Sequence, residues 1–422
     1  MLHINKIRDN QESFIALLKV KNIDATDLIT NAIVKDDKRK ETQQSADELL
    51  AKGNKLAKQI GELYKTGKAT EANELKEESS SIKKESKVLQ EKQAMLEKEI
   101  QDILVQIPNI PHPSVPVGKS DADNIIIREA GTIPTLTKGS KPHWELTSDY
   151  SLIDFELGNK ITGAGFPVYT NKGAKLQRAL IAYFLDKNID AGYTEYLPPH
   201  VVNEASGFGT GQLPKFEEDL YKIPSDKDLY LIPTAEVPVT NFFRDVIVQE
   251  FPIKCTAYTP CFRREAGSYG KEVRGLNRLH QFDKVEIVQI QHPEKSYETL
   301  DMMVNHVASI LDELELPYKI VQLCGGDLSD ASALTFDFEV FSAGQERWLE
   351  VSSVSNFESY QSNRLKLRYK DENGKIQLCH TLNGSALALP RIYAALIENN
   401  QTSEGIKIPK ALQSYTGFDI IK

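Results

Sequence analysis

The stretch that decides the fold of this chain, residues 262–286, reads FRREAGSYGKEVRGLNRLHQFDKVE. Gly267 and Gly270 punctuate a turn between two runs that are rich in β-forming residues, so we predict a strand, a loop and a second strand. Arginine bonds phosphate oxygens in pairs and stacks on aromatic rings. The hairpin is therefore either an anion site or an ordinary solvated hairpin with charged rungs. The basic side chains on its two limbs are Arg263, Arg274, Arg278 and His280.

The order of residues in this hairpin resembles motif 2 of the class II aminoacyl-tRNA synthetases. That motif joins Phe-Arg-x-Glu, here at 262–265, through a loop to Arg-Gly-Leu-x-Arg-x-His-Gln-Phe, here at 274–282. The inserted Ala-Gly-Ser-Tyr-Gly at 266–270 resembles the seryl-tRNA synthetase family in particular. The resemblance implies an α+β fold, in which an antiparallel β-sheet flanked by helices is preceded by an N-terminal antiparallel α-helical coiled-coil arm.

Composition is that of a soluble globular protein with room for two or three domains. The 422 residues are 40% hydrophobic and 26% charged, and no apolar run approaches the ~20 residues that span a bilayer. The segment MLHINKIRDNQE has no apolar signal core and no transit-peptide pattern, so we expect a cytoplasmic protein. The net charge of −9 gives no general attraction to nucleic acid, and RNA binding would need a local basic face.

The four cysteines lie apart from one another and form no Cys-x-x-Cys pair, nor do they have histidine partners at ligand spacing. Scattered thiols of this kind are most simply reduced residues in or near the core. We therefore expect no zinc.

Two long helical patterns follow one another between residues 27 and 105, and the turn at 65–68 makes them an antiparallel hairpin. A polar residue stands at several positions where the second apolar stripe belongs, so we expect a thin seam and a flexible arm; these are Ser79, Ser86 and Gln93. The apolar residues that recur every seven positions are Leu49, Leu56 and Leu63 in the first pattern, then Leu75, Ile82, Leu89, Leu96 and Ile103 in the second.

Taken alone, such a hairpin is a dimerisation rod or a spacer. Ahead of a class II core it resembles the arm with which seryl-tRNA synthetases grip the long variable arm of their tRNA. The prolines of IPNIPHPSVP at 107–116 cannot continue a helix and mark a linker. We predict a helical coiled-coil tRNA-binding domain, a linker and a class II catalytic domain, over residues 1–107, 108–118 and 119–422.

Further motifs follow in the catalytic part. A helical pattern at 172–188 and a strand that ends at Pro199 resemble motif 1, which builds the homodimer interface in this family. GTGQLPKF at 209–216 is a Gly/Pro loop that resembles a stretch of the same family. Thr234 and Glu236 place a hydroxyl and a carboxylate on one side of a segment that we expect to be extended, where they could hold a cation.

The last motif runs from His380 through Gly384 and Ser385 to Arg391. We expect a Gly-Ser turn that feeds a helix with Arg391 near its start, an arrangement that favours a bound phosphate. The segment resembles motif 3, except that Pro390 replaces the glycine that usually precedes the arginine. Proline suits the first turn of a helix, so the departure leaves the role of Arg391 in place.

The resemblance implies that the protein activates serine with ATP to seryl-adenylate and transfers the seryl group to tRNA(Ser), and to tRNA(Sec) where the host has it. Arg263 and Arg391 are the expected catalytic residues, and Mg²⁺ is expected with ATP on oxygen atoms of Glu350 and Ser353. The expected ATP contacts are Arg263, Arg264, Glu265, Arg274, Phe282, Glu350, Val351, Ser352, Ser353 and Arg391. The expected serine contacts are Thr234, Ala235, Glu236, Arg263, Glu286, Asn383 and Ser385.

Two other functions remain open. One is a synthetase-like ligase that loads an amino acid onto a carrier protein, although such relatives typically lack the helical arm. The other is a non-catalytic RNA-binding scaffold with a decayed synthetase core. Loss of Arg263, Glu350 or Arg391 would favour the scaffold, and all three residues are present.

Overall fold

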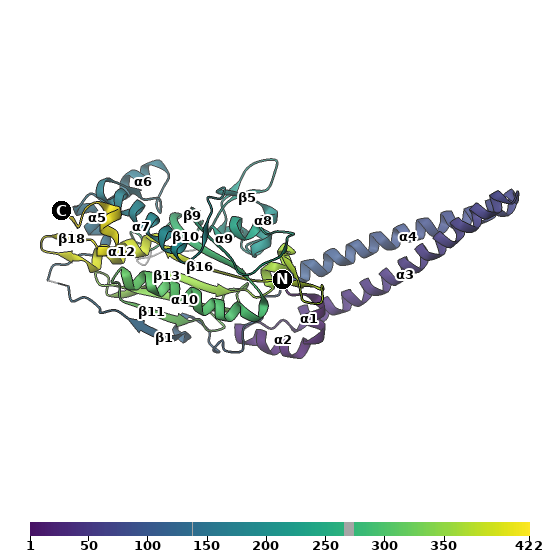
Figure 1. The fold of residues 1–422 in the computed structure, drawn as a ribbon, viewed down its shortest axis with the longest axis horizontal. Helices are drawn as coiled ribbons and strands as arrows, with labels where there is room; N and C mark the ends of the chain where they lie inside the picture. The colour runs from purple at the N-terminus through teal and green to yellow at the C-terminus, as the bar shows by residue number, and fades with distance from the viewer. Residues whose placement is uncertain (137, 266–273) are drawn as a thin grey trace. The chain divides into compact units, whose positions relative to one another are not determined.

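The fold is that of a computed structural model, which describes residues 1–136, 138–265 and 274–422 (Figure 1). The turn expected at Gly267 and Gly270 lies outside the described residues. Among the helices that the structure describes, none combines the length and the apolar character needed to cross a bilayer.

The chain divides into two compact units. The first, which we call the helical unit, consists of Leu2–Lys19 and Ile23–Pro108. The second, which we call the sheet unit, consists of Met1, Val20–Asn22 and Asn109–Lys422. A short piece of the N-terminal region therefore belongs to the sheet unit.

The helical unit is built on a long antiparallel hairpin, visible in Figure 1 as α3 and α4. The chain reverses at residues 66–68, where Gly67 has a φ of +79° that glycine adopts without strain. The helices pack along the predicted heptad positions, with Leu56 and Ile82 buried, and Ser86 is buried in the same seam. The helices of this unit are α1 (Ile4–Asp9), α2 (Gln11–Leu18), α3 (Thr26–Lys65) and α4 (Ala69–Leu104).

Asp36 on α3 is the centre of a charge cluster in the helical unit. Its side chain is 1% exposed and forms ion pairs with Arg8 at 2.8 Å, Arg39 at 2.9 Å and Lys40 at 3.1 Å. Loss of Asp36 would leave these three cations, whose side chains are 21% to 47% exposed, beside one another without the buried carboxylate that pairs them. This cluster therefore ties α1 to α3.

We expect Asp36→Ala to destabilise the helical unit by about 3 kcal/mol. Urea unfolding followed by far-ultraviolet circular dichroism measures it, while the fluorescence of Trp144 and Trp348, both in the sheet unit, should be unchanged. Asp37→Ala is the matched control, because Asp37 also pairs with Arg8 but is 51% exposed and should cost less than about 1 kcal/mol. Equal effects of the two substitutions would contradict the account.

The sheet unit contains the remaining elements that the structure describes. Its helices are α5 (His143–Asp149), α6 (Phe155–Ile161), α7 (Asn171–Asp190), α8 (Glu204–Thr210), α9 (Glu236–Asn241), α10 (Ser296–Glu313), α11 (Tyr360–Leu365), α12 (Leu389–Asn399) and α13 (Lys410–Thr416). Its strands are β1 (Ile125–Ala130), β2 (Ile153–Asp154), β3 (Val168–Tyr169), β4 (Thr194–Glu195), β5 (Val201–Asn203), β6 (Lys222–Ile223), β7 (Leu229–Leu231), β8 (Ile247–Val248), β9 (Ile253–Phe262), β10 (Gln281–Gln291), β11 (Tyr318–Gln322), β12 (Leu334–Ser342), β13 (Arg347–Asn356), β14 (Arg368–Lys370), β15 (Ile376–Leu378), β16 (His380–Ala388), β17 (Gln401–Thr402), β18 (Gly405–Lys407) and β19 (Ile420–Ile421).

The main sheet has eight strands among the described residues, in the order β1-β11-β12-β13-β16-β10-β9-β4. Neighbouring strands are antiparallel except β4, which runs parallel to β9. The expected antiparallel sheet flanked by helices is thus confirmed, with one short parallel pair at its edge. The reason is that α7, which packs on β9 and β10, delivers the chain to the edge of the sheet in the direction of β9.

The two strands of the predicted hairpin are confirmed, since Phe262 at the end of β9 pairs with Gln281 at the start of β10. Side chains alternate along β10. Val285 and Ile287 belong to the hydrophobic core formed with residues of α7, α10 and α12. Lys284 and Glu286 lie on the opposite face, where they line a cavity. One face of this strand therefore builds the core and the other builds the site.

Two local expectations are wrong. Thr234 and Glu236 do not lie in an extended segment, because α9 begins at Glu236. Gly384 and Ser385 do not form a turn, because they lie within β16, paired with β10 on one side and β13 on the other. Pro390 does stand in the first turn of α12, as expected.

Candidate active site

A cavity of about 740 Å³ opens on the face of the main sheet opposite α7, α10 and α12. This volume suits a nucleotide-sized ligand. The strands β10, β13 and β16 supply its floor, and the end of α8 with the segment that follows it to residue 216, together with the turn at 329–331, supply parts of its wall. The predicted residues that line it are Thr234, Glu236, Arg263, Glu265, Phe282, Glu286, Glu350, Val351, Ser352, Ser353, Asn383, Ser385 and Arg391.

Two arginines are held in the cavity by backbone carbonyls. Arg263 donates from Nε to the carbonyl of Pro233 at 3.3 Å, and its guanidinium lies 5.2 Å from the centre of the Phe282 ring. Arg391 donates from Nε to the carbonyl of Asn277 at 3.0 Å and from Nη1 to the carbonyl of Glu350 at 2.8 Å. Carbonyl partners orient a guanidinium without neutralising it. Arg391 also pairs with the carboxylate of Glu350, whose Oε2 lies 3.7 Å from Nη1, so an anionic ligand would compete with Glu350 for this arginine.

The donor set around Glu350 consists of oxygen atoms. Glu350 and Ser353 both line the cavity from β13, and Ser353 pairs in register with Asp337 of β12. Burial, and then the charge of Glu350, raise the pKa of Asp337 well above its ordinary value. No group of three or more His, Cys, Asp or Glu residues is placed to hold a metal in the part of the chain that the structure describes. The residues present fit Mg²⁺, which takes oxygen ligands and keeps waters and substrate phosphates in its shell.

An acidic pair with different partners lies elsewhere in the cavity. Glu286 Oε2 lies 2.5 Å from Lys284 Nζ and accepts a hydrogen bond from the Thr234 hydroxyl at 3.1 Å. Glu236 Oε1 accepts a hydrogen bond from the amide of Gln361 at 2.6 Å. Burial, and then the neighbouring charge of Glu286, raise the pKa of Glu236 to about 7. An incoming cation would meet one carboxylate that is already paired with a lysine and one that is not.

Three predicted residues do not line the cavity. Arg264 is exposed, and its backbone N–H donates to the carbonyl of Asp219 at 3.0 Å. Arg274 is exposed with its guanidinium 4.8 Å from the centre of the Trp144 ring. Ala235 is fully buried in a small hydrophobic cluster under the site. The structure therefore keeps these three beside the cavity rather than in it.

Several cavity residues were not expected as site residues. Lys284 stands two positions before Glu286, and the period of a strand would have been enough to find it. Asn277 and Arg278 lie in the motif at 274–282, and Thr210 and Gln212 lie in the motif at 209–216, so those motifs were the signal for them. Ser329, Asp330 and Phe357 come from other parts of the chain and have no such local signal.

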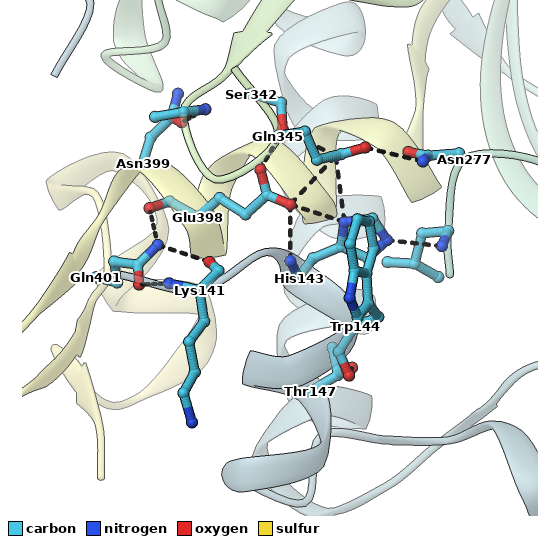
Figure 2. A network of polar contacts seen from close by, with 12 residues as sticks. Lys141, His143, Trp144, Thr147, Asn277, Ser342, Gln345, Glu398, Asn399 and Gln401 are labelled. Atoms are coloured by element: carbon cyan, nitrogen blue, oxygen red, sulfur yellow. Dashed lines mark hydrogen bonds and ion pairs between the residues drawn. The ribbon is translucent and has the colours of Figure 1, made fainter. Parts of the chain in front are cut away.

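A buried polar network holds the chain where it re-enters the cavity after the central loop (Figure 2). His143 Nε2 accepts the backbone N–H of Leu276 at 2.9 Å, so its proton is on Nδ1, which donates to Glu398 Oε1 at 2.8 Å. Gln345 bonds the same oxygen at 3.2 Å and accepts from the Asn277 side chain at 2.9 Å. Because Asn277 also supports Arg391, the network fixes backbone that the site depends on.

Comparison with known proteins gives the same picture along the whole chain. Residues 1–111 match the model of the seryl-tRNA synthetase N-terminal domain, and residues 216–400 match the class II core domain of the Gly, His, Pro, Ser and Thr tRNA synthetases. The chain is 46% identical to the serine–tRNA ligase of Salinibacter ruber, covering 99% of this chain and 98% of that one. It is 47% identical to that of Akkermansia muciniphila, covering 100% and 99%.

Solved structures agree. A seryl-tRNA synthetase from Pyrococcus horikoshii complexed with ATP superposes with a TM-score of 0.91 at 34% identity, covering 100% of this chain and 99% of that one. The cytoplasmic serine–tRNA ligase of Naegleria fowleri with AMP gives 0.88 at 28% identity, covering 100% and 99%. The chain therefore belongs to the seryl-tRNA synthetase family.

Proposed function

We propose that the protein is a serine–tRNA ligase, which activates L-serine with ATP and esterifies it to tRNA(Ser). The observation that carries this proposal is one cavity that combines carbonyl-held Arg263 and Arg391 with the acidic pair Glu236 and Glu286. The arginines suit the phosphates of ATP, and the carboxylates suit the ammonium and hydroxyl of serine.

The first step needs no general base, because the carboxylate of serine is already ionised at neutral pH. A serine carboxylate oxygen attacks the α-phosphorus, the bond to the β-phosphate oxygen breaks, and pyrophosphate leaves. In the second step a terminal hydroxyl of tRNA attacks the seryl carbonyl and AMP leaves. The protein must position two anions and relieve their repulsion.

We assign the nucleotide contacts as follows. Arg263 holds the α-phosphate and Arg391 the γ-phosphate end, while Glu265 faces the adenine and Phe282 stacks against it. Glu350 and Ser353 would hold Mg²⁺, which neutralises phosphate charge when bound with ATP. Val351 and Ser352 of β13 also contact ATP. Arg264 and Arg274 lie beside the cavity, and we propose that they contact the phosphates once ATP is bound.

We assign the serine contacts to the residues around the acidic pair. Thr234 and Glu286 already share a hydrogen bond, Glu236 adjoins them, and Asn383 and Ser385 face the same cavity from β16. Ala235 supports this cluster from the core. Arg263 binds the carboxylate side of serine, because its guanidinium adjoins Pro233 and Thr234.

We expect kcat/KM for serine to fall as the pH is lowered through about 7. The free-enzyme pKa of Glu236 lies near that value, so its carboxylate becomes protonated below it and loses its charge for the ammonium. Bound serine favours the ionised form of Glu236, so kcat at saturating serine should stay constant down to a lower pH than kcat/KM does. Pyrophosphate exchange at saturating ATP measures both. A profile unaltered in Glu236→Gln would contradict the assignment.

We place tRNA binding on the hairpin α3–α4, in a domain over residues 1–107, followed by a linker at 108–118 and a catalytic domain at 119–422. A homodimer is proposed as well, because the resemblance to motif 1 coincides with Leu197, which is 81% exposed beside Pro199. Where the host has tRNA(Sec), we propose that it is also charged with serine. The work of the enzyme in protein synthesis places it in the cytoplasm.

Charging of purified tRNA species with labelled serine tests this function. We expect esterification of serine to its own isoacceptors, and to tRNA(Sec) where present, with no transfer to other tRNAs. Formation of seryl-adenylate followed by transfer to a carrier protein, with no tRNA charged, would overturn the proposal in favour of a carrier-protein ligase.

A further inference from the structure

A buried glutamine outside the proposed serine contacts lies directly behind Glu236. Gln361 lies on α11 and is 1% exposed. Its Nε2 donates to Glu236 Oε1 at 2.6 Å and to the carbonyl of Thr210 at 3.1 Å. Its Oε1 accepts from the Thr381 hydroxyl at 2.7 Å. Every polar atom of this side chain is therefore engaged.

The neighbours of Gln361 allow one orientation of its amide. If the amide were reversed, Oε1 would face the carboxylate of Glu236 and the carbonyl of Thr210, which are both acceptors. Buried acceptors that face each other without a proton are strongly unfavourable. The donor side of Gln361 is therefore held toward Glu236, and the direction of Oε1 of Glu236 is set from behind.

The two carboxylates of the acidic pair, Glu236 and Glu286, are supported in chemically different ways. Glu286 is paired with the cation Lys284 at 2.5 Å, whereas Glu236 is held by a neutral amide. A neutral donor orients a carboxylate without cancelling its charge. The charge of Glu236 therefore remains for a cation that arrives with the ligand, and the ammonium of serine is such a cation.

Helix α11 also holds the loop opposite Glu236. Arg364 donates from Nη1 to the carbonyls of Phe208 and Leu213, both at 3.1 Å, and its guanidinium lies 4.8 Å from the centre of the Phe208 ring. These carbonyls flank Thr210, which Gln361 bonds directly. One short helix thus sets the positions of a carboxylate and of a wall of the same cavity.

We propose that Gln361 is a positioning residue of the serine subsite, which holds Glu236 Oε1 in place as the acceptor for the ammonium of serine. The inference rests on the proposed function and deepens it, because it selects Glu236 rather than Glu286 as the ammonium partner. Gln361 itself does not touch the substrate.

The test is Gln361→Met, which keeps the volume of the side chain and removes its donor. We expect KM for serine to rise roughly 10- to 100-fold, the range for losing a hydrogen bond to a charged group, with KM for ATP unchanged. The pH at which kcat/KM for serine falls should move upward, because a donor that favours the ionised form of Glu236 is gone. The charged groups that face Glu236, namely Glu286, Lys284 and Arg263, are the same in both proteins.

Gln177→Met is the matched control. Gln177 is 5% exposed and donates to Asp283 Oδ2 at 2.8 Å, so it is also a buried amide that serves a carboxylate. Asp283 alternates with Lys284 along β10 and points away from the cavity. We expect both KM values and the pH profile to match those of the unsubstituted protein.

Gln361→Glu is a second, isosteric variant in case the methionine disturbs folding. It places a second carboxyl beside Glu236, and because two carboxyls so close share a proton, the pH at which kcat/KM for serine falls should move further upward than in Gln361→Met. Equal rises in KM for serine and ATP with an unshifted pH profile, or an unchanged KM for serine, would overturn the inference. Absence of serine-dependent exchange in the unsubstituted protein would instead overturn the proposed function.

Discussion

Replacing Arg263 by alanine is expected to lower kcat/KM in serine-dependent ATP–pyrophosphate exchange roughly 10²- to 10³-fold. Its guanidinium is held by the carbonyl of Pro233 and the ring of Phe282, and its charge acts on Glu236. A charge held in place this way stabilises the pentavalent phosphorus of the transition state without reorganising. Initial exchange rates over a matrix of serine and ATP concentrations measure the loss.

Arg263→Lys separates charge from geometry in the same assay. Lysine keeps the charge but cannot bond two phosphate oxygens from one planar group. We therefore expect an activity between that of Arg263→Ala and that of the unsubstituted protein. Arg368→Ala is the control for loss of an arginine, since Arg368 pairs with Asp245 at 2.6 Å away from the cavity. Activity of Arg263→Ala equal to that of the control would contradict the assignment.

Shortening the hairpin α3–α4 is expected to abolish efficient tRNA charging while leaving adenylate formation intact. If the arm and the cavity bind one tRNA together, losing one site should lower kcat/KM for tRNA roughly 10²- to 10⁴-fold, the gain that linked binding sites provide. Exchange does not involve tRNA and should stay at the level of the full-length protein. Charging and exchange measured on the same preparation test both halves of this prediction.

The structure defines where to cut. Lys35 pairs with Glu99 at 2.5 Å and Lys52 with Glu78 at 2.8 Å, which gives the register of the two helices. Residues 1–40 joined to 94–422 through the native turn at 65–68 keep that register. Undiminished charging by this protein would show that the hairpin is a rod or spacer rather than a tRNA-binding arm.

Deleting the whole segment 1–107 would be a poorer experiment, because Met1 and Val20–Asn22 belong to the sheet unit. Lys21 donates to the carbonyls of Ser329 and Ser332 at 2.9 and 2.8 Å. Ser329 lines the cavity. Deleting Lys21 could therefore disturb the cavity itself, and a loss of tRNA charging could no longer be attributed to the hairpin.

Much of the fold could be predicted from local patterns. The heptads place Leu56 and Ile82 in the seam of the hairpin because a seven-residue period keeps one helix face toward its partner. The central strands were predictable because their apolar runs are long and are separated by a glycine-rich stretch of sequence. The parallel pairing of β4 was not, since its direction depends on how α7 packs on the sheet.

Residues that line the cavity were predictable where they fall in short motifs, as Arg263 and Glu265 do in one motif and Arg391 in another. The site was not predictable where distant segments meet. Gln361 is about 125 residues from Glu236, and its role comes from the packing of α11 behind α9. Local context also misleads at Gly384, where pairing with strands on both sides overrides the turn that glycine suggests.

Amino-acid-dependent ATP–pyrophosphate exchange shows whether this cavity activates serine. We expect exchange with L-serine, and roughly 10⁴-fold less with L-alanine, because a site built to bond a hydroxyl leaves its polar groups unpaired when the hydroxyl is missing. No exchange with serine, or equal exchange with alanine, would contradict the account.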